Sequence, residues 1–194
     1  IWKMTDDKPI DPDQLLRSIV NEQKREKRGL LRIFFGMCPG VGKTYAMLQA
    51  AQEHKRNGSE VLVGIVETHS RKETLAVLDG LEVLKRKRID YRGKDFDELD
   101  VELILKRRPK LVLIDELAHT NVPGSRHSKR YHDVNEILDA GIDVFTTVNV
   151  QHLESLNDQV RGITGVQVRE TLPDWVLQEA YEIVLIDLPP LATV

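Results

Sequence analysis

Residues 30–51 constrain the fold of this chain more than any other segment. Their sequence is LLRIFFGMCPGVGKTYAMLQAA. The apolar run at 30–35 has the length of one buried strand, the glycines that follow predict a turn, and 45–51 favours a helix. A strand, a glycine-rich turn, a Lys-Thr pair and a helix in this order are typical of a phosphate-binding loop.

The chemistry expected of this segment is the binding of nucleotide phosphates. Glycines allow backbone N–H groups to converge on phosphate oxygens, and the following helix adds the positive end of its dipole. Lys43 is expected to reach the β- and γ-phosphates, and the Thr44 hydroxyl to ligate Mg²⁺. The residues predicted to form the site are Gly36, Pro39, Gly40, Val41, Gly42, Lys43 and Thr44.

The segment departs from the usual phosphate-loop pattern at two positions. Met37 stands where the first glycine is expected, and Gly36 lies one residue earlier. Pro39 has no N–H to donate, so one amide is missing. The alternative is a glycine-rich turn with a chance Lys-Thr pair, but its placement between a strand and a helix favours phosphate binding.

The composition is that of an ordinary globular domain. The chain has 194 residues, 41% hydrophobic and 30% charged, with a formal net charge of −3, which argues against a nucleic-acid-binding protein. A single cysteine, Cys38, excludes an internal disulfide. The first residues show no signal-peptide pattern, and no apolar stretch approaches the ~20 residues of a membrane helix. We expect a soluble polypeptide that could be part of something larger.

Strands and helices are predicted to alternate along one domain. Residues 1–10 are expected to be a flexible lead-in, and 11–194 a single domain with a helix at 11–28, beginning at Asp11-Pro12, and an α/β core at 30–190. Because the predicted strands are apolar without alternation, we expect a three-layer α/β fold of the P-loop NTPase type with a mostly parallel sheet. Further strands are predicted at 60–68, 89–91, 110–116, 142–150, 167–172 and 182–187, and helices at 70–81, 99–107, 131–139, 152–160 and after Pro173.

A phosphate loop needs an acidic partner for Mg²⁺, usually an aspartate that ends an apolar strand. Asp115 and Asp187 both qualify. We favour Asp115, because Glu116 beside it is a carboxylate able to orient a water or accept a proton, whereas Asp187 precedes Leu-Pro-Pro. Glu67, at the end of another predicted strand, is an alternative catalytic base.

The polar loop at 118–129 is expected where ligands bind in open α/β sheets. Arg126 is predicted to stabilise charge on a γ-phosphate or to anchor a partner; the alternative is an exposed loop with nothing bound. The segment 146–152 could sense the γ-phosphate, or its threonines could simply be good strand formers. The six histidines lack metal-ligand spacing, so no zinc site is expected.

Four segments together resemble a known family. GMCPGVGKTYAML, VGIVETHSRKET, LVLIDELAHTNVPGSRHSKRYHDV and AGIDVFTTVNVQHLESLNDQV are similar to the amino-terminal cytoplasmic domain of the KdpD family. The members are bacterial sensor histidine kinases that control high-affinity potassium uptake. The resemblance implies an atypical Walker A motif at 36–44, a Walker B motif at Asp115 and Glu116, and ATP with Mg²⁺ as cofactors.

The resemblance also implies a regulatory role within a larger inner-membrane protein. Its partners would be the downstream domains of the same kinase and, indirectly, a response regulator, and the parent would be a homodimer. The fragment itself would be neither membrane-inserted nor bound to nucleic acid. Two other functions stay open: an ATPase or hydroxyl phosphotransferase with Glu116 and Arg126 as catalytic residues, and an interaction module in which nucleotide is only a structural ligand.

Overall fold

The computed structural model describes residues 16, 27–37, 39–69, 71–165 and 168–187. Its centre is a six-stranded, all-parallel sheet with the strand order β3-β2-β6-β7-β1-β8. The strands are β1 (Leu31–Gly36), β2 (Val61–Ile65), β3 (Glu82–Val83), β6 (Leu111–Ile114), β7 (Asp143–Asn149) and β8 (Glu182–Ile186). The predicted α/β class with a mostly parallel sheet is therefore confirmed.

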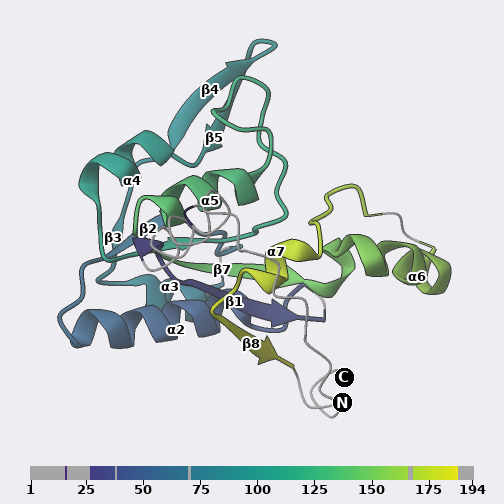
Figure 1. Ribbon diagram of the computed structural model, residues 1–194, viewed down its shortest axis with the longest axis horizontal. Coiled ribbons are helices and arrows are strands. Elements are labelled where there is room, and N and C mark those ends of the chain that lie inside the picture. The colour runs from purple at the N-terminus through teal and green to yellow at the C-terminus, as the bar shows by residue number, and fades with distance from the viewer. Residues whose placement is uncertain (1–15, 17–26, 38, 70, 166–167, 188–194) are drawn as a thin grey trace, which may run out of the picture.

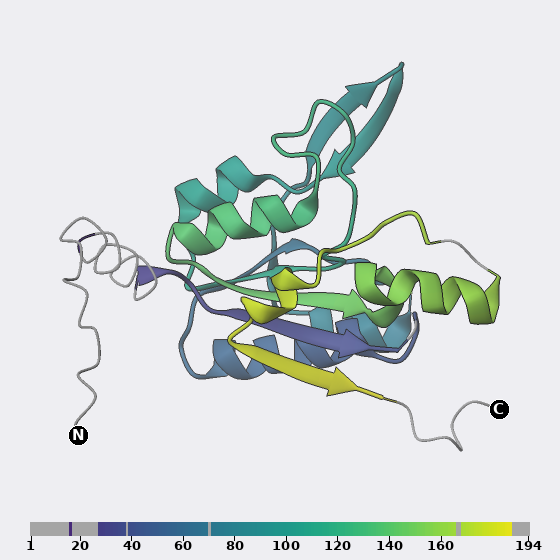
Figure 2. The same ribbon diagram turned by 45° about the vertical axis from the view of Figure 1, so that its right-hand side comes forward.

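Helices cover both faces of the sheet (Figures 1 and 2). On one face lie α2 (Lys43–Arg56) and α3 (Lys72–Leu78), and on the other α4 (Val101–Arg107) and α5 (Arg130–Asp139). A 3₁₀ turn, η1 (Val150–His152), leads from β7 into α6 (Glu154–Thr164), and α7 (Trp175–Gln178) precedes β8.

The central strand β6 shows why the sheet needs two covering layers. Leu111 and Leu113 pack into the core that contains Met47 of α2, whereas Val112 and Ile114 pack into the core that contains α4 and α5. All four of its residues are buried. A strand buried on both faces has a continuous apolar sequence, which is the pattern that predicted it.

A β-hairpin that the sequence only partly predicted projects from the body of the domain (Figure 2). Strands β4 (Lys87–Tyr91) and β5 (Lys94–Glu98) pair antiparallel and form a separate sheet. The turn residues Arg92 and Gly93 both have positive φ, 53° and 74°, as in the type I′ turns that favour tight hairpins. The strand predicted at 89–91 belongs to β4, but the charged sequence KDFDE concealed β5.

Other predictions at the level of single elements were less accurate. The strand predicted at 167–172 is wrong for the described residues, where only Leu172 forms an isolated bridge, to Leu153. The helix predicted at 70–81 ends at Leu78, and β3 was not predicted. The lead-in at 1–10 and nearly all of the helix predicted at 11–28 lie outside the described residues. Of the helices in the described ranges, none combines the length and apolar character that crossing a membrane requires.

Gly29 provides a test of the packing at the start of β1. A Cβ at this position would lie 2.0 Å from the Ile142 carbonyl oxygen. The backbone of Ile142 cannot easily move away from such a Cβ. We expect Gly29→Ala to destabilise the fold by about 1–3 kcal/mol or more.

The matched control is Gly162 in α6, where a Cβ would meet nothing within 4 Å. Gly162→Ala should stabilise by roughly 0.5–1 kcal/mol, because alanine loses less conformational entropy in a helix. Urea unfolding of both variants measures the difference; equal stabilities would contradict the packing described for Gly29.

Candidate functional site

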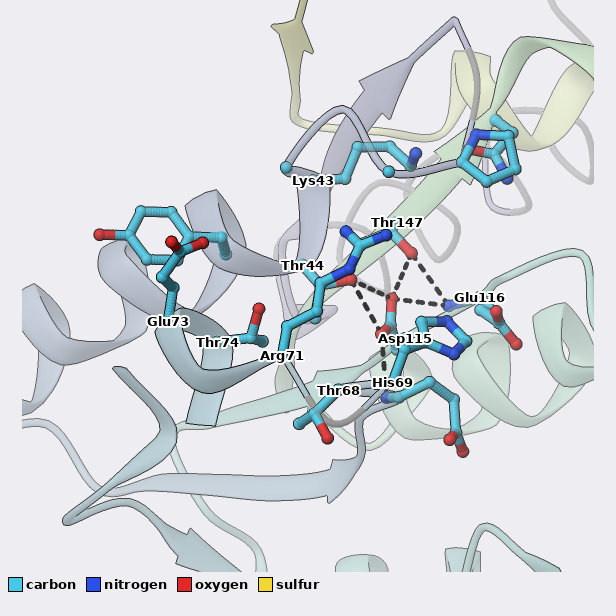
Figure 3. A pocket seen from close by; sticks show the side chains of 16 residues that line it. Lys43, Thr44, Thr68, His69, Arg71, Glu73, Thr74, Asp115, Glu116 and Thr147 are labelled. Carbon is cyan, nitrogen blue, oxygen red and sulfur yellow. Dashed lines mark hydrogen bonds between the residues drawn. The ribbon is translucent and has the colours of Figure 1, made fainter. Parts of the chain in front are cut away.

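A cavity of about 480 Å³ lies at the carboxyl edge of the sheet, where β1, β2, β6 and β7 end. Figure 3 shows its lining side chains. They are Pro39, Gly40, Gly42, Lys43, Thr44, Tyr45, Glu67, Thr68, His69, Arg71, Glu73, Thr74, Asp115, Glu116, Thr147 and Asn149. The edge at which strands end is where parallel α/β sheets bind ligands.

The turn between β1 and α2 depends on its glycines. Gly40 and Gly42 have φ values of 90° and 97°, which residues other than glycine rarely adopt. A Cβ on Gly36 would lie 2.6 Å from Val41 Cγ2 and 3.0 Å from Lys43 Cδ. The displaced glycine at position 36 thus allows the turn to fold back closely on the end of β1.

The residues of this turn divide between the cavity and the core. Pro39, Gly40 and Gly42 line the cavity, whereas Val41 belongs to the buried hydrophobic core. Lys43, the first residue of α2, lines the cavity although the residue is only 7% exposed. A cation is therefore placed beside the turn in a partly desolvated setting.

Asp115, directly after β6, is the most buried charged residue of the site, with 1% of its surface exposed. Its Oδ2 accepts hydrogen bonds from the Thr44 hydroxyl at 3.1 Å and from the Glu67 N–H at 3.1 Å. Its Oδ1 accepts from the Glu116 N–H at 3.1 Å and from the Thr147 hydroxyl. The dashed lines of Figure 3 mark this network.

The network brings together residues predicted from separate segments. Thr44 and Asp115 are in direct contact. Asp187, the alternative aspartate, is exposed and is not among the described residues that line the cavity.

Glu116 has an unusual backbone and an unusual environment. Its φ is 56°, a left-handed conformation that costs energy for a residue other than glycine or asparagine. The residue lines the cavity, and the pKa of its carboxylate is raised, first by desolvation and second by the charge of Asp115. A raised pKa makes a carboxylate a better proton acceptor.

The segment after β2 forms another wall of the cavity. Thr68, His69 and Arg71 line it together with Glu67, whose carboxylate pairs with Arg86 at 2.9 Å. The sequence drew attention to Glu67 but not to Arg71. The signal that could have found Arg71 is its position just after the carboxyl end of a buried strand.

The structure does not bring Arg126 to the cavity. Its guanidinium forms two hydrogen bonds to the Glu136 carboxylate, at 2.7 and 2.5 Å, and lies 3.7 Å from Glu102. The loop at 118–129 is tied to α5 through Asn121 and His127, which both bond to Asp133. Of its described residues, none lines the cavity.

The residues of the segment 146–152 lie partly at the cavity and partly in the core. Thr147 and Asn149 line the cavity, whereas Thr146 is fully buried. Among the described residues, Asn149 Oδ1 and His152 Nδ1 are buried without a hydrogen-bond partner. Desolvation lowers the pKa of His152. Sensing of a γ-phosphate by this segment stays a prediction.

A second buried network begins on the other side of Asp115. The guanidinium of Arg130, 2% exposed, donates to the Asp115 carbonyl oxygen at 2.9 Å and lies 3.4 Å from Glu98 at the end of β5. Glu98 also bonds to His119 at 3.1 Å and accepts from the Val122 N–H at 2.9 Å. This network connects the edge of the cavity with the base of the hairpin.

Comparisons with known proteins agree on one family. Residues 27–193 match the family model described as KdpD, osmosensitive K+ channel His kinase sensor domain. The sensor protein KdpD of Escherichia coli (strain K12) is 58% identical over 180 residues, which cover 93% of this chain and 20% of that protein. The sensor protein KdpD of Clostridium acetobutylicum is 51% identical with the same coverage. A putative sensor protein KdpD of Synechocystis sp. is 52% identical over 84% of this chain and 44% of its own length.

The buried pair of Glu98 and Arg130 provides a test of the second network. Glu98→Ala would leave the Arg130 guanidinium buried without its carboxylate, so we expect a loss of about 3–5 kcal/mol in the free energy of unfolding. The control is Glu82→Ala, which removes an exposed carboxylate bonded to Arg107 and should change stability little.

The loss caused by Glu98→Ala should also depend on pH. Burial alone would raise the pKa of Glu98, but the hydrogen bonds with His119 and the Val122 N–H lower it below its ordinary 4.5. The stabilisation of the fold by ionised Glu98 is therefore complete above about pH 4.5 and is lost as the pH falls through the folded-state pKa of Glu98. Denaturant unfolding of wild type and variant from pH 7 to pH 3 should show the two stabilities converging; a constant difference would contradict this origin.

Proposed function

This chain belongs to the KdpD sensor-domain family, and we propose that it binds Mg-ATP and thereby regulates the histidine kinase of which it forms a part. The chain spans about a fifth of the length of the first curated relatives it matches, so the remaining functions of such a kinase would lie in other regions. Control of potassium uptake, homodimerisation, membrane attachment and action through a response regulator are proposed for the whole protein.

One observation carries the proposal: a glycine turn, a buried lysine and a threonine–aspartate pair share one cavity. Gly40 and Gly42 hold the turn in a left-handed conformation, Lys43 is beside them, and the Thr44 hydroxyl bonds to Asp115 at 3.1 Å. These are the donor types that P-loop proteins use for phosphates and for Mg²⁺. Because Gly36 provides the close approach of the turn to β1, the displaced glycine is compatible with that function.

Mg²⁺ would be held jointly by the protein and the nucleotide. Among the described residues, no group of three or more His, Cys, Asp or Glu side chains could hold a metal ion by itself. Mg²⁺ usually keeps several waters and is bound through one or two carboxylates plus substrate phosphates. Thr44 and Asp115 would supply the oxygen ligands that come from the protein, and the ion would neutralise charge on the phosphates.

Glu116 supports a second candidate function, turnover of the bound nucleotide. The residue lines the cavity, and its carboxylate has a raised pKa, as expected of a group that accepts a proton from water or from a hydroxyl. An ATPase or phosphotransferase activity would use the same site as regulatory binding. Release of phosphate from radiolabelled ATP by this chain distinguishes the two functions.

The first test of nucleotide binding is Lys43→Ala. A charged hydrogen bond to phosphate contributes about 1.5–3 kcal/mol, so we expect the affinity for Mg-ATP to fall roughly ten- to a hundredfold by calorimetry. The control is Lys55→Ala, which removes the same charge near the opposite end of α2. An unchanged dissociation constant in Lys43→Ala would refute the assignment of the turn.

The second test concerns the role of Asp115 in binding Mg²⁺. Asp115→Asn should reduce the gain in ATP affinity that Mg²⁺ provides by about ten- to a hundredfold, the range seen when a metal site loses a supporting group. Asp187→Asn should leave that gain unchanged, because Asp187 does not line the cavity. Calorimetric titrations with Mg²⁺ and with EDTA measure the gain, and circular dichroism checks that the Asp115 variant is folded. Equal losses in both variants would disprove the choice of strand.

A further inference from the structure

We infer that Arg71 is a second phosphate-binding cation of this site and that it contacts the terminal phosphate of bound ATP. The inference rests on the proposed function and assigns one residue of the cavity wall to one part of the ligand. It predicts that the site distinguishes ATP from ADP through a side chain that lies outside the glycine turn.

The position of the guanidinium is the first observation. A Cβ built on Gly40 would lie 3.3 Å from Arg71 Nη2 and 3.9 Å from Nη1. The Arg71 side chain therefore reaches from the start of α3 to the glycine turn that follows β1 (Figure 3). Both residues line the same cavity as Thr44 and Asp115.

The backbone of Arg71 is anchored, whereas its side chain is available. Its N–H donates to the Thr68 carbonyl at 3.0 Å, and its own carbonyl accepts from the Leu75 N–H at 3.0 Å. Within the described part of the chain, the guanidinium has no hydrogen bond or ion pair. Because the backbone is already fixed, only the side chain has to be ordered when a ligand binds.

Three other arginines around the cavity and the adjoining loop are already engaged by carboxylates. Arg86 pairs with Glu67 at 2.9 Å, Arg126 with Glu136, and Arg130 with Glu98. Among the described residues that line the cavity, Lys43 and Arg71 are the lysine and arginine side chains.

The acidic residues of the cavity wall favour a second cation for phosphate binding. The acidic residues Glu67, Glu73, Asp115 and Glu116 also line the cavity, so a triphosphate needs more positive charge there than Lys43 and Mg²⁺ alone provide. Guanidinium groups bind phosphate through two parallel N–H donors. Because loop amides bind the inner phosphates, a donor that reaches over the turn from another segment is placed for the phosphate that extends beyond it.

The test compares ATP with ADP in Arg71→Ala. By calorimetry with saturating Mg²⁺, we expect ATP affinity to fall about ten- to a hundredfold, the effect of one charged hydrogen-bond group, while ADP affinity changes less than about threefold. Arg71→Lys should restore part of the ATP affinity. Lys72→Ala is the matched control, since it removes a neighbouring exposed charge that does not line the cavity, and it should affect neither nucleotide.

The outcomes separate this inference from the proposed function. An Arg71→Ala variant that binds ATP as tightly as wild type, or that loses ATP and ADP equally, overturns the role at the terminal phosphate even where Lys43→Ala abolishes binding. A wild-type chain that binds no Mg-ATP overturns both. Because the side chain is exposed, the melting temperature of Arg71→Ala should equal that of wild type, so lost affinity would reflect a lost contact rather than unfolding.

Discussion

The candidate site depends on one buried charge, the carboxylate of Asp115. An ionised carboxylate that is 1% exposed costs several kcal/mol unless hydrogen bonds replace its lost hydration. The donors come from α2, from the segment after β2, from the next residue along the chain and from β7. Satisfying one carboxylate therefore holds four segments together at the carboxyl edge of the sheet, and the cavity forms between them.

Arg130 places a buried positive charge near that negative one. Its guanidinium contacts the Asp115 carbonyl oxygen and the Glu98 carboxylate, so it takes part in the networks of both the cavity and the hairpin. Desolvation lowers the pKa of Arg130, but the charges of Glu98, Glu116 and Asp115 oppose that effect. The hairpin is thus attached to the domain partly through a charge pair that is costly to break, although β4 and β5 form no hydrogen bonds with the central sheet.

The sequence predicted the central sheet well and the hairpin poorly, for one physical reason. A strand buried on both faces is largely apolar, as at Leu111–Ile114, and such runs are visible without a structure. The strand Lys94–Glu98 is almost entirely exposed, so its pairing derives from backbone hydrogen bonds and a positive-φ turn rather than from an apolar pattern. The segment ending at Leu172 was wrongly predicted as a strand. Its composition suits a strand, but within the described residues it forms only one bridge.

The sequence predicted which residues lie together at the cavity where backbone position alone determines this, and it missed contacts that depend on side-chain partners. Thr44, Asp115 and Glu116 come together because the turn after β1 and the end of β6 lie at the same edge of the parallel sheet. Arg126 also follows a strand end, but Glu136 on α5 accepts its two hydrogen bonds, a pairing that sequence spacing does not specify. Arg71 lies in a charged stretch that resembles any exposed helix start, and only its approach to Gly40 distinguishes it. For long cationic side chains, the segment can be predicted from the sequence, but the contact depends on which carboxylates lie within reach.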